Sequence, residues 1–254
     1  MKNPTNRKIF FILLLACLIS SVFILPYVLT LMQGVGLVIT PALIIGQIIQ
    51  TIILFSFATI IGLRLANKVG FGLPIIESFL KKEKLVNMKS WWRLSISFGV
   101  IASALIILLS WPFGSLSTTF LKAEMAVATW KSFLASFYGG IAEEVLLRLF
   151  LMTLLVWITF KIKKTTDGKP TVIGIWLAII LSSVIFGLGH LPITGGLTAI
   201  TPIVVIRAIV LNGVAGVMFG WLYWKKGLES AMLSHFTADI CLHVLTPLIA
   251  SFFI

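Results

Sequence analysis

Long apolar stretches, interrupted by short polar or basic segments, dominate the pattern of this chain of 254 residues. A helix needs about 20 predominantly apolar residues to cross the hydrocarbon core of a bilayer. Seven stretches have this character, and we predict a membrane helix in each: residues 9–32, 37–63, 94–113, 126–160, 171–190, 202–224 and 228–245. The pattern therefore predicts an all-α fold, a polytopic bundle of seven to eight transmembrane helices that forms a single membrane domain over residues 1–254.

The first two spans are predicted to form a hairpin. No charged residue occurs from Ile9 to Leu63, and the intervening Gln33-Gly34-Val35-Gly36 is typical of a tight turn. The basic segment 64–93 follows, and within it Pro74 opens a stretch that mixes apolar and charged positions. Two interpretations stay open for this stretch: an interfacial amphipathic helix on the cytoplasmic face, or a solvated linker.

The fourth span is too long for one upright helix. Residues 126–160 would extend roughly 50 Å as a continuous helix, against a hydrocarbon core of about 30 Å. The helix must therefore tilt, extend beyond the bilayer, or break at Gly139-Gly140. By contrast, the apolar tail 247–254 is too short to cross the membrane as a helix.

The sixth span carries a stripe of small residues, Gly213, Gly216 and Gly220. Small residues let helix backbones approach closely in a membrane, so the stripe predicts a packing face. Arg207 in the same span is interpreted as an interfacial residue.

Charge is sparse and clustered. The chain is 59% hydrophobic and only 11% charged, a composition typical of polytopic membrane proteins. Its formal net charge of +12 comes from short basic clusters between apolar stretches, which is the positive-inside pattern and not that of a nucleic-acid-binding surface. With a cytoplasmic amino terminus, these clusters alternate correctly across all seven spans. We therefore expect a multi-pass integral protein of a bacterial plasma membrane, in contact with membrane lipids and not with nucleic acid.

Three charged residues lie together inside the fourth span: Glu143, Glu144 and Arg148. An ionisable side chain near the bilayer centre costs roughly 2.5–3.5 kcal/mol on insertion scales, so such groups usually face a partner, a cavity or a reaction. Glu144 and Arg148 are one helical turn apart on the same face and are predicted to form an ion pair. Glu143 lies about 100° around the helix from Glu144. We therefore interpret Glu143 as the carboxylate that is free for chemistry.

Two histidines and an aspartate complete the candidate set. His190 ends the fifth span, and His235 and Asp239 share one face of the seventh, so Asp239 can orient the His235 imidazole or stabilise its charge. A carboxylate and two imidazoles in a partly dry cavity can activate a water as general base, or bind a zinc ion that lowers the pKa of water. The sequence has no HExxH, GxSxG or GxGD motif, which disfavours other intramembrane hydrolase chemistries. His243, two turns beyond His235, is interpreted as a packing or interfacial residue.

The order of these residues resembles that of a known family. Glu143-Glu144-x-x-x-Arg148, Phe186-x-x-x-His190 and His235-x-x-x-Asp239 follow one another on successive predicted helices, as in the CAAX prenyl protease and bacteriocin-processing (CPBP, or abortive-infection) family of intramembrane endopeptidases. The resemblance covers roughly residues 125–245. It implies an all-helical membrane core of about eight helices, with residues 1–120 contributing N-terminal spans and residues 125–245 the catalytic core. Eight helices would require either a break in the long fourth segment or a partial helix in the tail.

The resemblance also implies a role for each residue of the motifs. Glu143 would be the water-activating base, assisted by His190. His235 and the residue at position 239 would stabilise the oxyanion. Glu144 and Arg148 would support the site.

Asp239 departs from the family pattern, which has asparagine at this position. An amide can donate a hydrogen bond to an oxyanion and an ionised aspartate cannot, so Asp239 must be protonated, orient His235, or ligate a metal. Glu143, His190, His235 and Asp239 are therefore candidate ligands of a zinc ion. A metal-free mechanism with the same residues is an equal alternative.

The expected function is that of an intramembrane endopeptidase that hydrolyses a membrane-associated peptide or lipidated protein. The substrate is expected to be either of the prenylated CAAX type or bacteriocin-like. A bacteriocin-like substrate would imply a role in bacteriocin immunity. Two alternatives from other classes stay open. One is a non-catalytic membrane scaffold that binds a peptide or confers immunity. The other is a proton-coupled transporter in which Glu143 and the histidines relay protons.

Helix geometry leaves the depth of the motifs open. Counting about 1.5 Å per residue, Glu143 lies about 27 Å from Lys161, whereas His235 lies only about 10 Å from Gly227. If the flanking loops lie in one plane, the two side chains cannot meet. Either the helix before Lys161 projects beyond the bilayer, or the Lys225-Lys226 turn is embedded with its side chains reaching the surface.

Overall fold

A computed structural model describes residues 4–32, 40–84 and 88–253 of the chain. In this part of the chain, seven helices are long and apolar enough to cross a membrane. They are Pro4–Leu31, Ile44–Val69, Met88–Phe113, Thr129–Ile162, Val172–Gly195, Pro202–Lys226 and Leu228–Ala250. The chain is therefore a multi-pass integral membrane protein with the predicted all-α fold. The turn predicted at Gln33-Gly34-Val35-Gly36 lies outside the described residues.

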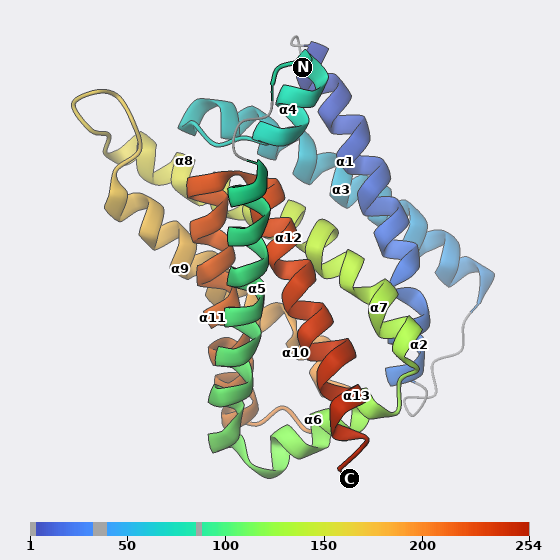
Figure 1. The fold of residues 1–254 in the computed structure, drawn as a ribbon. Coiled ribbons are helices and arrows are strands. Elements are labelled where there is room, and N and C mark those ends of the chain that lie inside the picture. Colours follow the sequence, from blue (N-terminus) through green and yellow to red (C-terminus); the bar gives the residue numbers. More distant parts are fainter. Residues whose placement is uncertain (1–3, 33–39, 85–87, 254) are drawn as a thin grey trace.

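The bundle has two distinct ends (Figure 1). The amino terminus lies at one end beside the short helix α4 (Pro74–Lys81), and the carboxyl terminus lies at the other beside α6 (Ser115–Met125). We call these the α4 end and the α6 end.

The first half of the chain crosses between the two ends three times. Helix α1 (Pro4–Phe23) continues as the short α2 (Leu25–Leu31), and α3 (Pro41–Val69) returns beside α1 to the α4 end. Helix α5 (Met88–Ser110) then runs to the α6 end, where a single 3₁₀ turn leads into α6.

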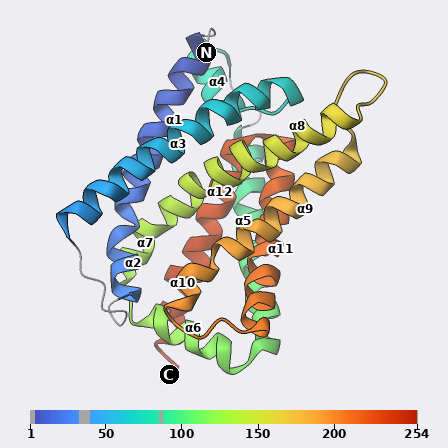
Figure 2. The same cartoon turned by 180° about the vertical axis from the view of Figure 1, so that it is seen from behind.

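The long fourth span does not break at Gly139-Gly140. Helix α7 (Thr129–Phe137) passes through two π-helical segments, η3 (Tyr138–Glu143) and η4 (Val145–Met152), into α8 (Thr153–Ile162). Figures 1 and 2 show this span inclined relative to the more upright α5 and α11. The structure therefore excludes the break at Gly139-Gly140 and shows the span inclined to its neighbours.

The second half continues from α8 as a helical hairpin and then as two helices that lie side by side. Its elements are α9 (Val172–Gly189), α10 (Leu191–Gly195), α11 (Pro202–Lys226), α12 (Leu228–Asp239), the π-helical η5 (Ile240–Leu245) and α13 (Thr246–Ala250). Helix α13 prolongs α12 through η5, so the apolar tail extends the seventh span and adds no eighth one.

Helices α9 and α11 pack closely because glycines line their contact. A Cβ atom on Gly216 of α11 would lie 2.8 Å from Ser183 Cβ of α9, and one on Gly220 would lie 3.1 Å from Ile179. Gly187 of α9 contributes to the same contact from the other helix, since a Cβ at this position would lie 2.6 Å from the Cα of Ile209. The predicted small-residue stripe is thus confirmed at Gly216 and Gly220. At Gly213 a Cβ would meet nothing within 4 Å, so that position is not part of the contact.

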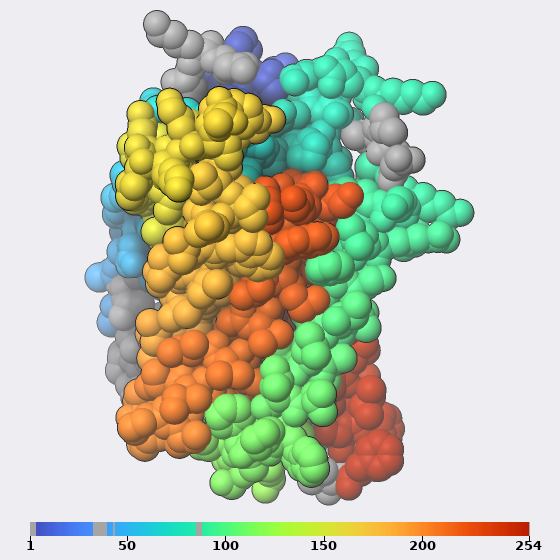
Figure 3. Space-filling view, turned by 90° about the vertical axis from the view of Figure 1, so that its left-hand side faces the viewer, coloured from blue at the N-terminus to red at the C-terminus, as the bar shows by residue number. Residues whose placement is uncertain are grey.

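The outward faces of the spans are apolar. In α9, Ile173, Leu177 and Leu181 are exposed, whereas Ile175 and Ile179 face the core. Figure 3 shows α9 and α11 running beside α5 on one such face. Apolar side chains exposed in this way are what a lipid-facing surface requires.

Helix α4 covers the turn between α11 and α12. The Glu229 carboxylate of α12 accepts hydrogen bonds at Oε1 from the backbone N–H groups of Ile75 and Ile76, 3.0 and 2.9 Å away, in the first turn of α4. The Leu228 N–H donates to the Gly72 carbonyl at 3.1 Å. Of the two interpretations of the stretch after Pro74, the helix is therefore the correct one.

The loops that flank the motif helices do not lie in one plane. In Figures 1 and 2 the α8–α9 hairpin reaches further in the direction of the amino terminus than does the turn between α11 and α12. This turn is also the one that α4 covers. The difference in loop height, together with the tilt of the fourth span, allows Glu143 and His235 to reach the same depth.

Candidate active site

The three charged residues of the fourth span lie on its π-helical part. Glu143 ends η3, Glu144 separates the two segments, and Arg148 lies in η4. Single-turn π-helices are frequent at functional sites because they redirect side chains relative to a regular α-helix. Here they place Glu143 and Glu144 so that both reach the same residue of α12, His235.

The predicted ion pair between Glu144 and Arg148 is present. Arg148 Nε lies 3.3 Å from Glu144 Oε2, and both side chains are fully buried. The guanidinium carbon also lies 5.7 Å from the ring centroid of Phe186. Among the described residues, none of the three guanidinium nitrogens of Arg148 has a hydrogen-bond partner, so its interaction with Glu144 is an ion pair between two buried charges.

Glu144 also binds His235, which sequence reasoning did not anticipate. His235 Nδ1 donates to Glu144 Oε1 at 2.8 Å, while Oε2 of the same carboxylate faces Arg148. The imidazole is further fixed by stacking on Phe219, with ring centroids 4.7 Å apart and planes inclined by 25°. Glu144 is therefore a bridge that orients His235, and its pairing with Arg148 is only half of its role.

The other nitrogen of His235 faces two carboxylates. Nε2 lies 3.8 Å from Glu143 Oε2 and 3.5 Å from Asp239 Oδ1. The side chain of His235 is 6% exposed, against 24% for Glu143 and 15% for Asp239. The ring thus presents one nitrogen to a buried support and the other to a partly accessible pair of carboxylates.

Two glycines allow η3 and α12 to approach each other at this point. A Cβ atom on Gly139 would overlap the Asp239 carboxylate and would lie 3.1 Å from His235 Nε2. A Cβ on Gly140 would lie 2.8 Å from Phe236 Cβ. Gly139-Gly140 is therefore required for close packing around the site, and it does not break the helix.

His190 lies beside this cluster without joining it through a hydrogen bond. It caps the C-terminal end of α9, its side chain is partly buried, and its Nδ1 lies 2.9 Å from the Phe186 carbonyl oxygen. The Phe186 ring contacts both imidazoles, with centroid distances of 4.7 Å to His190 and 5.6 Å to His235. Within the described residues no hydrogen bond or ion pair links His190 to Glu143. If Nδ1 carries the proton, Nε2 of His190 remains available to a ligand.

A second polar cluster, also missed from the sequence, lies towards the α6 end. His243 Nδ1 lies 3.1 Å from Glu124 Oε1, and the Tyr27 hydroxyl donates to the same oxygen. Burial alone raises the pKa of the Glu124 carboxyl, but the charge of His243 and the hydrogen bond from Tyr27 hold it below its ordinary value. His243 is therefore part of a polar cluster and not an apolar packing residue, while the other interpretation, an interfacial residue, is not contradicted by its side-chain exposure of 38%. The signal for it was its position one turn beyond Asp239 on the same helix face.

Another hydrogen-bonded chain joins the backbone of the motif helix to α11. The Thr153 hydroxyl donates to the Arg148 carbonyl at 2.9 Å and lies 2.9 Å from the Tyr223 hydroxyl. All three residues are buried. These bonds fix η4 against α11 and so hold Arg148 in place beneath Glu144.

Zinc is the metal that the resemblance suggests for the donors of this site. The support of His235 Nδ1 by a carboxylate is the arrangement that metal-binding histidines commonly have. However, the described residues contain no group of three or more His, Cys, Asp or Glu side chains placed to hold a metal ion. The chemistry proposed below therefore uses these side chains alone.

The arrangement can supply a base and a hydrogen-bond donor to one reacting centre. Glu143 is the most exposed of the three carboxylates at the site, with 24% of its side chain accessible against 15% for Asp239 and 0% for Glu144. The imidazole of His235, when protonated on both nitrogens, presents an Nε2–H group within reach of the same space. A base and a fixed donor converging on one point are the elements of water-dependent amide hydrolysis.

One family model matches the second half of the chain. Residues 125–241 match the model of a family described as type II CAAX prenyl endopeptidase Rce1-like. No curated protein and no solved structure matches the chain. The match confirms the resemblance to the CAAX protease family over the second half of the chain and indicates a CAAX-type endopeptidase as the kind of function.

Proposed function

We propose that this protein is an intramembrane endopeptidase that hydrolyses a peptide bond of a membrane-associated substrate, of the prenylated CAAX type or bacteriocin-like. The observation that carries the proposal is the position of the His235 ring. It is held at Nδ1 by Glu144, at 2.8 Å, and faces Glu143 and Asp239 through Nε2. A scaffold that only binds peptides does not require a buried network of charged side chains such as Arg148, Glu144 and His235.

The first chemical step uses Glu143 as base. Its carboxylate takes a proton from a water molecule while the water oxygen attacks the carbonyl carbon of the scissile bond. The carbon becomes tetrahedral and its former carbonyl oxygen becomes an oxyanion. Glu143 then transfers the proton to the amide nitrogen, the carbon–nitrogen bond breaks, and the products are a carboxylic acid and an amine. His190, whose ring contacts Phe186, assists by orienting the water through Nε2.

His235 and Asp239 stabilise the oxyanion. A doubly protonated His235 donates through Nε2–H, and two carboxylates, Glu144 at Nδ1 and Glu143 near Nε2, lie beside its charge. Asp239 adds a second donor in its protonated form, because an ionised carboxylate has no hydrogen to donate. The carboxyl of Asp239 is 15% exposed and lies 3.5 Å from His235 Nε2, close enough to act at the same oxygen.

Glu144 and Arg148 position the site without contacting the substrate. Both are fully buried, and Glu144 connects Arg148 to His235 through its two oxygens. Removing one partner of such a buried network leaves an uncompensated charge. The pair therefore holds the imidazole in one orientation and one charge state.

We further propose that the α4 end faces the cytoplasm, with the amino terminus on the same side. The basic residues of α4, of the α8–α9 loop and of the α11–α12 turn gather there, including Lys81, Lys163, Lys164, Lys225 and Lys226. Positive residues near the ends of membrane helices favour the cytoplasmic side. The support for this orientation is that charge distribution.

Reconstitution in proteoliposomes separates this function from its alternatives. The purified protein is incubated with a fluorogenic lipidated peptide, and cleavage, proton flux and peptide binding are measured on the same vesicles. Cleavage that disappears in the Glu143→Gln variant supports the endopeptidase. Proton-coupled flux dependent on Glu143, without cleavage, would instead establish a transporter, and saturable binding with neither activity would establish a scaffold.

A further inference from the structure

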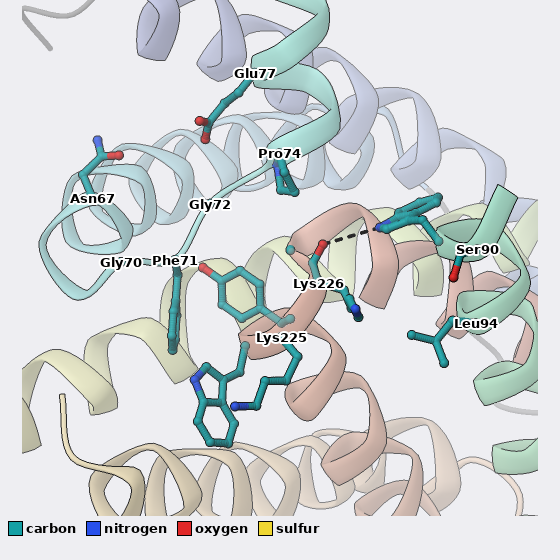
Figure 4. A pocket seen from close by; sticks show the side chains of 14 residues that line it. Asn67, Gly70, Phe71, Gly72, Pro74, Glu77, Ser90, Leu94, Lys225 and Lys226 are labelled. Atoms are coloured by element: carbon teal, nitrogen blue, oxygen red, sulfur yellow. Dashed lines mark hydrogen bonds between the residues drawn. The ribbon is translucent and has the colours of Figure 1, made fainter. Parts of the chain in front are cut away.

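A cavity of about 690 Å³ opens at the α4 end of the bundle. It lies between the end of α3, the connection from α3 to α4, the start of α5 and the end of α11 (Figure 4). None of the motif residues lines it, so it is separate from the candidate active site. Nothing in the proposed chemistry uses this space.

Two lysines give the cavity its charge. Lys225 and Lys226 form the last turn of α11, and both are exposed. Neutral polar groups, Asn67 and Ser90, line other parts of the wall. Figure 4 shows Lys225 and Lys226 on one side and Asn67 on the other.

The acidic side chain in the wall is already engaged. Glu77 Oε1 accepts a hydrogen bond from the Leu73 N–H at 3.1 Å, which closes the first turn of α4. The nearby Glu229 carboxylate, outside the wall, binds two backbone N–H groups of α4. The wall carries two lysines against the one carboxylate of Glu77, so the net charge that the cavity offers to a ligand is positive.

Tryptophans fix the basic side of the cavity. The Trp91 Nε1–H of α5 donates to the Lys226 carbonyl at 3.4 Å, the bond drawn in Figure 4. Lys225 Nζ lies 3.5 Å from the ring centroid of Trp224. Tryptophan prefers the level of the lipid headgroups, so these contacts place the two lysines at the membrane surface.

We propose that this cavity binds the phosphate of an anionic phospholipid headgroup. A phosphate group can come from a lipid or from a soluble metabolite, and the surroundings favour the lipid. Leu94 lines the cavity, and the outward face of α5 continues below it with exposed apolar residues such as Val100 and Ile101, along which acyl chains can lie. Basic residues at the cytoplasmic boundary are the recognition groups that anionic lipids use. This site is independent of the proposed peptidase chemistry and rests only on the orientation proposed above.

The test compares lipid binding of two variants with equal loss of charge. Lys225→Gln/Lys226→Gln removes both positive groups from the cavity, whereas Lys163→Gln/Lys164→Gln removes two exposed lysines from the α8–α9 loop at the same end of the bundle. Purified protein in a neutral detergent is titrated with phosphatidylglycerol and, separately, phosphatidylcholine, and bound lipid is counted by native mass spectrometry. We expect the cavity variant to bind phosphatidylglycerol at least about fivefold more weakly, and the loop variant to bind like the wild type.

Four outcomes would overturn the proposal. Equal weakening in both variants would show a diffuse effect of surface charge, and an unchanged affinity in the cavity variant would place the lipid elsewhere. Equal binding of phosphatidylglycerol and phosphatidylcholine would show that the negative charge of the lipid does not contribute to binding. As a separate arm, soluble glycerol phosphate is added as competitor. Displacement of the lipid at comparable concentrations would identify the soluble phosphate as the ligand and contradict a lipid site.

Discussion

His235 donates through Nδ1 to Glu144 Oε1 at 2.8 Å and so joins two helices whose contact residues are 91 positions apart in the chain. The same carboxylate faces Arg148 through its other oxygen, at 3.3 Å. One buried acid thus connects the first and third motifs. Because of this connection, the imidazole presents Nε2, and not Nδ1, to Glu143 and Asp239.

Glu144→Gln is predicted to destabilise the protein strongly. The amide keeps the shape of the side chain but leaves Arg148 buried without a counter-charge, at a cost of roughly 3–5 kcal/mol. The measurement is thermal unfolding of the purified protein in detergent. The matched control is Asp167→Asn, which breaks the exposed pair with Lys169 and is expected to leave the unfolding temperature unchanged. A similar unfolding temperature for both variants would show that the Glu144 bridge is not structural.

Gly139→Ala is predicted to reduce activity by displacing Asp239. The added methyl group would overlap the Asp239 carboxylate and crowd His235 Nε2, so both oxyanion donors would move. Gly213→Ala is the control, because a Cβ at that position of α11 meets nothing within 4 Å. Cleavage rates are compared at equal amounts of folded protein. We expect at least about a tenfold loss for Gly139→Ala, as for a lost oxyanion donor, and a normal rate for Gly213→Ala. Equal cleavage rates for the two variants would show that the position of the Asp239 carboxyl does not affect the reaction.

The cluster of Glu124, His243 and Tyr27 predicts a pH-dependent stability. Because the pKa of Glu124 is lower in the folded chain than its ordinary value, the carboxylate stabilises the fold above that ordinary value, about 4.3, and the contribution is lost as pH falls through the folded pKa. The unfolding temperature of the wild type should therefore exceed that of Glu124→Gln at pH 6, with a difference that shrinks below about pH 4. A difference that grew on acidification would contradict the assignment of the shift.

Chelation is predicted to leave cleavage intact. The side chains of the site, as the described residues place them, supply a base and donors but no three-residue metal group. The measurement is the cleavage rate before and after dialysis against a chelator, with zinc content determined on the same sample. One zinc per chain, with loss of activity on its removal and recovery on its return, would contradict the metal-free chemistry.

Much of the architecture followed from the sequence because membrane spans and helix periodicity are local properties. A run of apolar residues is enough to predict a span, and a separation of four residues is enough to predict that Glu144 pairs with Arg148. The family resemblance followed from three short motifs for the same reason.

Contacts between helices could not be predicted in the same way. The link from Glu144 to His235 depends on the tilt of the fourth span and on the π-helical turns that redirect its side chains. The pairing of Glu124 with His243 depends on where α6 lies against η5. Neither the tilt nor that packing leaves a periodic trace in the sequence, so the three residues of the second cluster were assigned no common role.

The most direct test of the central claim is the cleavage rate of Glu143→Gln on a lipidated peptide in proteoliposomes, compared with wild type and with Glu77→Gln. Glu77 binds the start of α4 and lies outside the site, so its variant controls for the loss of an acidic side chain. The proposed chemistry predicts that Glu143→Gln folds and binds the peptide but cleaves it at least about a hundredfold more slowly, since it lacks the general base, while Glu77→Gln cleaves normally. A Glu143→Gln protein that cleaves at the wild-type rate would contradict the assignment of Glu143 as the base.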